Sequence, residues 1–243
     1  MIEELATRMR PDDVADFRRV IAEARVSDQI LLNERAMGRM VGMVQWILRR
    51  VGEDGIRLTS SGYLPPAVVV AATAELDWGW PMSINRESHL RPLLELRSHL
   101  RDVGLLRVSK GVLHRTAQGR ALTEAPRELW WQLARTIHHS RKPAVVDATK
   151  LLLLFIAVRT LTKEEDYYAA IAYGLSTLGW LHRSENEVSP GDAHALVLEK
   201  WRLLVRLDVF ARDRHGDSGW TSTAAGAAFA RAALQSAATG TAS

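Results

Sequence analysis

One pattern of residues occurs twice in this chain, and at the start of the pattern the matching residues are 104 positions apart. Glu95 corresponds to Glu199 and Leu100 to Leu204, while the T-A-x-G motifs near the end correspond after a gap of three residues. A repeat of this kind indicates two copies of one structural unit. The copies are LLELRSHLRDVGLLRVSKGVLHRTAQGRAL, residues 93–122, and VLEKWRLLVRLDVFARDRHGDSGWTSTAAGAAF, residues 197–229.

The length of 243 residues allows two domains of about 120 residues, each large enough to bury a core. The chain has no cysteine, which excludes disulfides, thiolate metal sites and cysteine nucleophiles. The N-terminal residues lack the apolar stretch of a signal peptide, and the longest apolar run, Leu151 to Val158, is too short to span a bilayer. We expect a soluble cytoplasmic protein with no membrane partner.

Positive charge is concentrated in the first copy of the repeat. The whole chain has a formal net charge of +4, but the window from Arg86 to Arg120 alone carries a net charge of +5. The half from Arg141 to Ser243 is nearly neutral, with 12 basic and 11 acidic residues. An anionic partner is therefore expected at the first copy rather than at the second.

The pattern of apolar residues and helix breakers predicts four regions along the chain. A helix from Ser27 to Val51 is expected in the first region, because Met37, Val41, Val44 and other apolar residues follow a helical spacing. The predicted regions are an N-terminal helical extension over 1–55, a first domain over 56–140, a second domain over 141–234 and a disordered tail over 235–243.

The second domain is expected to contain three helices, a hairpin with its tip at residues 213–217 and a closing helix, and the first domain two helices, a hairpin and a closing helix. In the first domain we predict a short strand after Gly55 and a hairpin whose turn is Lys110-Gly111. Gly104 is predicted to end the preceding helix in a left-handed conformation. The helices are predicted over 65–76, 92–103 and 121–138 in the first domain, and over 145–159, 167–180, 193–207 (with Asp192 as its N-cap) and 224–233 in the second.

This order of elements resembles the winged-helix fold over residues 56–138 and 145–234. The resemblance implies a mainly α fold class: two winged-helix (winged helix-turn-helix) domains with small two-stranded β wings, preceded by the helical extension. Residues 56–131 also resemble uncharacterised bacterial proteins of an ORF-three-like family associated with plasmids and transposons. That similarity lies in LTSSGYLPPAVV, NRESHLRPLLELRSHLRDVGLLRVSKGVLHRTAQGRAL and ELWW, and it implies a domain but no activity.

The winged-helix resemblance implies a duplex DNA partner, with the third helix in the major groove and the wing on the backbone. Arginine suits this role because it binds phosphate oxygens and guanine edges. The predicted function is that of a non-enzymatic DNA-binding protein, in the manner of a transcriptional regulator. The candidate DNA-binding residues are Arg91, Arg97 and Arg101 in the helix and Arg107, Lys110 and Arg115 in the wing.

A second interpretation stays open, because acidic residues alternate with these cations. Arg91 and Glu95 are four residues apart, the spacing at which charges on an exposed helix face pair weakly. On this interpretation the modules contact another protein, or a second copy of the chain in a homodimer, and touch no DNA. Among the aromatic residues, Trp78 and Trp80 form the pair expected to be exposed for contact, and the tryptophans in helices are expected to be core.

The sequence contains no motif of an enzyme active site. Phosphate-binding loops, dinucleotide-binding glycine motifs, H-E-x-x-H and G-x-S-x-G are all missing. His138, His139 and Asp147 offer metal-ligating groups, but adjacent histidines in a linker rarely converge on one ion. We therefore predict no enzymatic activity, no cofactor and no metal.

Overall fold

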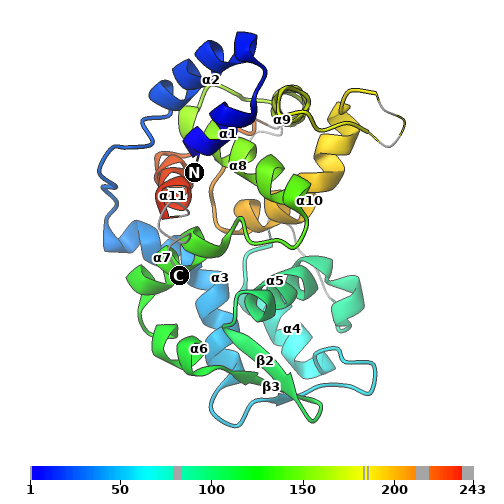
Figure 1. Cartoon of the computed structure of the whole chain (residues 1–243). Helices are drawn as coiled ribbons and strands as arrows, with labels where there is room; N and C mark the ends of the chain where they lie inside the picture. The colour runs from blue at the N-terminus through cyan, green and yellow to red at the C-terminus, as the bar shows by residue number, and fades with distance from the viewer. Residues whose placement is uncertain (1, 79–83, 183, 185, 212–218, 237–243) are drawn as a thin grey trace. The chain divides into compact units, whose positions relative to one another are not determined.

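A computed structural model describes residues 2–78, 84–182, 184, 186–211 and 219–236 (Figure 1). The protein is mainly helical and contains a small three-stranded antiparallel sheet. Its residues divide into two compact units. Unit 2 is Gly38–Trp130, and unit 1 combines Met1–Met37 with Trp131–Ser243. Among the residues just given, no helix is both long and apolar enough to cross a membrane.

Unit 2 contains the sheet, in the order β1-β3-β2. The central strand β3 pairs through Leu113 with Ile56 on one side and with Val108 on the other. The unit boundaries fall within its first and last helices. The elements are α3 (Glu34–Val51), β1 (Ile56–Arg57), α4 (Pro66–Glu75), the 3-10 turn η1 (Glu87–His89), α5 (Arg91–Asp102), β2 (Leu106–Ser109), β3 (Val112–Arg115), α6 (Ala117–Leu122) and α7 (Pro126–Thr136).

Helix α3 buries the apolar stripe predicted from the sequence, including Val41, Val44 and Leu48. The helix begins at Glu34 rather than at Ser27. Asn33 supplies the reason, because its side-chain oxygen accepts a hydrogen bond from the backbone N–H of Ala36 at 2.8 Å and so caps the helix. The stripe is core, as its helical spacing indicated.

The predicted hairpin is confirmed, with its turn at Lys110-Gly111. Both turn residues have positive φ, 49° and 73°, as a two-residue hairpin turn of type I′ requires. Gly104 is also left-handed, at φ 75°, and the N–H of Leu105 donates to the Leu100 carbonyl at 2.8 Å. Glycine is favoured there because it has no Cβ to clash.

The predicted closing helix over 121–138 is wrong in its extent. A short helix, α6, begins at Ala117, directly after the Thr116 cap, and a separate helix, α7, begins at Pro126. Proline has no N–H to donate and disfavours helical backbone at the residue before it, so the helix breaks at this point.

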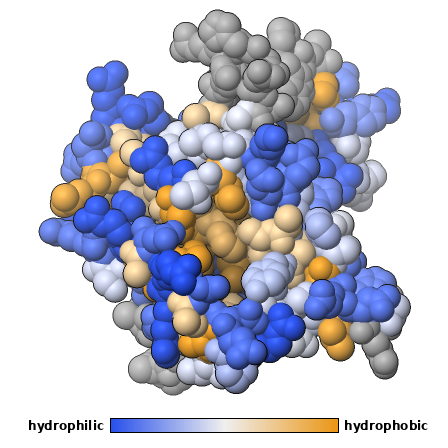
Figure 2. Space-filling view, turned by 90° about the horizontal axis from the view of Figure 1, so that it is seen from above, coloured by the Kyte–Doolittle hydropathy of each residue, from blue (hydrophilic) through white to orange (hydrophobic). Residues whose placement is uncertain are grey.

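Unit 1 is built around α8, whose side chains are buried along most of its length. Helices α9, α10, α11 and α2 pack against α8. Figure 2 shows the chain from the side where α2 and α9 lie in Figure 1, and apolar side chains gather near the centre of this face with hydrophilic ones around them. The helices are α1 (Ile2–Arg8), α2 (Pro11–Glu23), α8 (Pro143–Val158), α9 (Glu164–Thr177), α10 (Pro190–Arg206) and α11 (Ala224–Ser236).

Helix α10 begins at Pro190, two residues before the predicted cap Asp192. Ser189 is the N-cap, and its Oγ accepts a hydrogen bond from the N–H of Asp192 at 3.1 Å. The Asp192 carboxylate accepts from the Ser189 hydroxyl at 2.6 Å and from the Ser189 N–H at 3.0 Å, and the second bond completes a capping box. These bonds, the one from the hydroxyl most of all, lower the pKa of Asp192. Asp192 is therefore the third residue of the helix rather than its cap.

The two T-A-x-G turns have the same geometry. Thr116 and Thr223 each accept a hydrogen bond from the glycine three residues later, at 3.0 and 2.8 Å. In both turns the glycine lies against a carbonyl oxygen, so that an added Cβ would stand 2.1 Å from the oxygen of Leu105 or of Val209. The repeat in the sequence is thus a repeat of backbone structure.

The correspondence extends to the extended segments of unit 1. The N–H of Trp220 donates to the carbonyl of Thr162 at 2.7 Å, which matches the pairing of Leu113 with Ile56 in unit 2. Phe210 forms an isolated antiparallel bridge with Ser222. The predicted tip of the second hairpin, 213–217, lies outside the described residues.

The two units differ in extent from the regions predicted from the repeat. Residues 38–55 belong to unit 2 and residues 1–37 to unit 1, so the predicted extension is divided between them. The predicted boundaries at 55 and 140 follow the repeat rather than compactness, and they stay predictions. Of the tail predicted over 235–243, Gln235 and Ser236 lie in α11, and the remainder lies outside the described residues.

Candidate nucleic-acid interface

Helix α5 buries one face and exposes the other. Leu93, Leu96 and Leu100 are buried, whereas Arg91 and Arg101 are exposed. Ser98 and Asp102 are exposed as well, and Glu95 on the same helix is half-buried. Arg91 Nε lies 3.2 Å from Glu95 Oε1, one helical turn away. The exposed side therefore carries two arginines together with acidic side chains.

Arg97 points into unit 2 and is only 4% exposed. Its Nε and one terminal nitrogen donate to the two oxygens of Glu87 at 2.7 and 2.9 Å. The same carboxylate accepts from the backbone N–H of Leu64 at 2.7 Å, and Arg97 also donates to the Gly62 carbonyl at 3.2 Å. Arg97 thus joins α5 to the loop before α4, and a direct contact with DNA is closed to it.

Arg115 is also an internal residue, 9% exposed. Its Nε donates to the carbonyl of Gly52 at 3.0 Å, and a terminal nitrogen donates to Thr123 Oγ1 at 3.0 Å. The other terminal nitrogen pairs with Glu53. These bonds link β3 to the end of α3 and to the end of α6, so Arg115 serves the fold rather than the surface.

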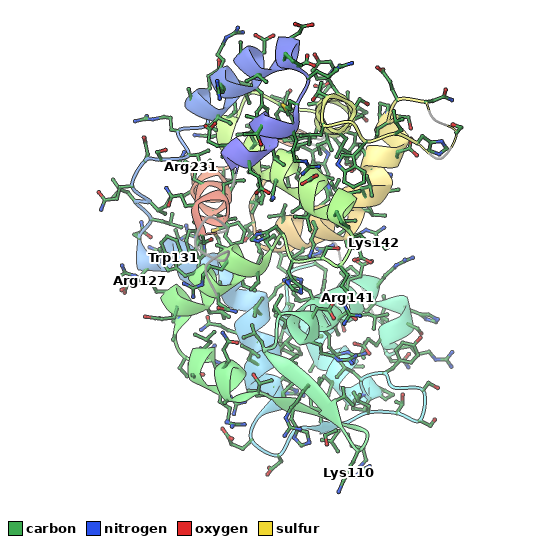
Figure 3. All side chains as sticks on the ribbon, in the orientation of Figure 1. Lys110, Arg127, Trp131, Arg141, Lys142 and Arg231 are labelled. Atoms are coloured by element: carbon green, nitrogen blue, oxygen red, sulfur yellow. The ribbon has the colours of Figure 1, made fainter. Side chains whose placement is uncertain are left out.

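The hairpin of β2 and β3 retains exposed cations, Arg107 on β2 and Lys110 in the turn. Lys110 extends away from the ribbon at the tip of the hairpin (Figure 3). Register places Arg107 opposite His114 and Ser109 opposite Val112, which pairs in turn with Arg57. Since side chains alternate along strands, Arg57 and Arg107 share one sheet face.

Arg57 was not among the predicted residues. The sequence indicated a short strand after Gly55, but nothing local in it identifies β3 as the partner strand. Of the six candidates, four are exposed: Arg91, Arg101, Arg107 and Lys110.

The corresponding helix of unit 1, α10, offers fewer exposed cations. By the 104-residue spacing, Ala195 and Val205 stand where α5 has Arg91 and Arg101. Lys200 is buried and Arg202 and Arg206 are half-buried. The buried positions of α10 match those of α5. The exposed arginines of α5, however, have no basic counterparts at the matching positions of α10. The candidate interface therefore belongs to unit 2.

The expectation of an exposed tryptophan pair is corrected in part. Trp78 is 2% exposed, and its indole N–H donates to the carbonyl of Ala72 at 2.9 Å, so it packs at the end of α4. Trp80 lies outside the described residues. Of the tryptophans predicted as core in helices, Trp130 and Trp201 are buried, whereas Trp46, Trp131 and Trp180 are half-buried.

Among the described residues, no group of three histidine or carboxylate side chains is arranged to hold a metal ion. Asp147 instead accepts from the Trp180 indole at 3.0 Å and pairs with Arg8 at 2.8 Å.

Comparison of the chain with protein-family models, curated proteins and solved structures finds no match.

Proposed function

We propose that the protein is a non-enzymatic DNA-binding protein and that unit 2 is a winged-helix domain docking on duplex DNA. The order α3-β1-α4-α5-β2-β3, with β3 in the centre of the sheet, supports the winged-helix assignment. In that fold the helix equivalent to α5 enters the major groove and the hairpin lies beside it.

The observation that carries the proposal is the exposure of four cations on those two elements. Arg91 and Arg101 lie on the uncovered side of α5, and Arg107 and Lys110 lie on the hairpin. Phosphate contacts need such cations spread along a docking face, and they set both the affinity and its dependence on salt. The buried Arg97 and Arg115 hold these elements in place.

Binding to a fluorescent duplex, measured by anisotropy at several salt concentrations, tests the proposal. We expect the triple variant Arg101→Ala/Arg107→Ala/Lys110→Ala to bind at least about tenfold more weakly. The slope of log K against the logarithm of the salt concentration should become less negative by about 0.9 for each phosphate group that the variant no longer neutralises.

A charge-matched control separates a docking face from general attraction. The variant Arg18→Ala/Arg19→Ala/Arg39→Ala removes three exposed arginines from α2 and α3, so it changes the net charge equally. This control should bind nearly as tightly as the natural protein. Equal losses in both variants would mean that no particular face is used, and the proposed interface would be rejected.

A second candidate function, self-association, is favoured by one observation on α4. Val70 is 50% exposed on this helix and Tyr63, just before it, is 36% exposed, while Ala67 and Ala74 are exposed on the same helix. An apolar surface of this kind suits a second copy of the chain. A dimer by light scattering that Val70→Lys converts to monomer, together with no duplex binding at low salt, would favour this function over the first.

A further inference from the structure

Unit 1 contains a cluster of buried nitrogen groups that the DNA-binding proposal does not use. Lys150 on α8 is 8% exposed and Lys200 on α10 is 9% exposed. His138, in the segment between α7 and α8, is half-buried. Helices α8 and α10 pack against each other, and Lys200 Nζ donates to the carbonyl of His139 at 3.1 Å.

The repeat indicates that Lys200 is not needed for the fold of this module. By the 104-residue spacing, the residue equivalent to Lys200 in unit 2 is Leu96, which is 3% exposed in the core. An apolar side chain therefore fills this position in the other copy. Burying an ammonium group costs free energy that a leucine avoids, so a lysine here calls for a reason other than packing.

The nearby carboxylate is shared among several groups. Asp147 Oδ2 receives the Trp180 indole N–H at 3.0 Å and the guanidinium of Arg8 at 2.8 Å. Lys150 Nζ stands 4.0 Å from Asp147 Oδ1, at the outer limit of an ion pair. Lys150 thus gains only part of the compensation that a buried charge needs.

His138 supplies the third nitrogen group of the cluster. Its Nδ1 is buried and has no hydrogen-bond partner among the residues that the structure describes. Burial lowers the pKa of His138 to about 4, and the ammonium groups of Lys150 and Lys200 contribute to the lowering. The imidazole is therefore neutral at pH 7, beside two positive charges.

We propose that His138, Lys150 and Lys200 form a binding site for a small oxyanion, the phosphate or carboxylate group of a small molecule. Two ammonium groups donate hydrogen bonds to oxyanions and offset their charge. The bound anion in turn offsets the repulsion between the lysines and favours protonation of His138, which then donates as well. The site lies within unit 1 and does not depend on DNA binding.

The test is a titration of the full chain with sodium phosphate, and separately with sodium succinate, at an ionic strength held constant with sodium chloride. The histidine Cε1–H resonances report on His138 by NMR. We expect a saturable shift of the His138 resonance below about 50 mM anion, and a rise in its pKa. A response to phosphate but not to succinate would identify the ligand group as phosphate, and the reverse as carboxylate.

Variants separate specific binding from the general stabilising effect of phosphate on proteins. Lys200→Leu places the residue of the first copy at this position, and Lys150→Met keeps the volume without the charge. Both variants should lose the saturable response, whereas Lys163→Met, which removes an exposed lysine of the same unit, should keep it. An unresponsive His138 in the natural protein, or an undiminished response in both variants, would overturn the proposal.

Discussion

The two T-A-x-G turns can form only because their glycines have no side chain. A Cβ on Gly119 or Gly226 would stand 2.1 Å from the backbone carbonyl oxygen of Leu105 or of Val209, so the turn or that backbone would have to move. We predict that Gly119→Ala lowers the free energy of unfolding, measured by urea denaturation, by about 1–3 kcal/mol.

Gly38→Ala is the matched control for this prediction. An added Cβ at Gly38 meets no atom within 4 Å, and the residue lies inside α3. Alanine should therefore raise the free energy of unfolding by about 0.5–1 kcal/mol. Similar effects of the two substitutions would contradict the close approach at Gly119.

The buried pair of Glu87 and Arg97 gives a second prediction at the residue scale. Glu87→Gln leaves the guanidinium of Arg97 buried opposite a neutral amide, and breaking such a pair costs about 3–5 kcal/mol. Glu124→Gln breaks the pair of Glu124 with Arg49, in which both side chains are exposed. That change should cost less than about 1 kcal/mol by the same denaturation measurement. Equal costs would contradict the structural role of Arg97.

At the scale of elements, the hairpin turn separates stability from binding. Lys110 adopts a left-handed conformation, at φ 49°, that asparagine tolerates better than lysine. Lys110→Asn should therefore raise the free energy of unfolding by about 0.5 kcal/mol while weakening duplex binding. A variant that is more stable and binds DNA as tightly as the natural protein would argue against a contact at the hairpin tip.

The sequence predicted most elements correctly because their signals are local. The apolar stripe of α3, the Lys110-Gly111 turn and Gly104 after α5 each depend on a few adjacent residues. The predictions for Arg97 and Arg115 were incomplete for the opposite reason. Their partners Glu87, Gly62, Gly52 and Thr123 come from other elements, and an arginine in a charged stretch does not reveal by itself whether it faces solvent or a buried carboxylate.

At the scale of the whole molecule, His138 makes stability depend on pH. Its pKa is about 4 in the folded chain and near 6.5 when unfolded, so between these values the unfolded chain binds a proton that the folded chain excludes. The free energy of unfolding should fall as pH is lowered from 7 to 4, by at most about 3 kcal/mol. His138→Leu should reduce this dependence of the free energy of unfolding on pH, whereas His89→Leu, at an exposed position, should not. Urea denaturation of both variants at several pH values tests the prediction.

The most direct measurement for the molecule as a whole is the backbone amide NMR spectrum of the full chain, recorded while duplex DNA is added at low salt. The account predicts the largest changes at Ser98 and Arg101 on α5 and at Arg107 and Lys110 on the hairpin, with small changes along α10 and α11. Changes centred on unit 1, or no change at any residue at duplex concentrations above those of the protein, would contradict it.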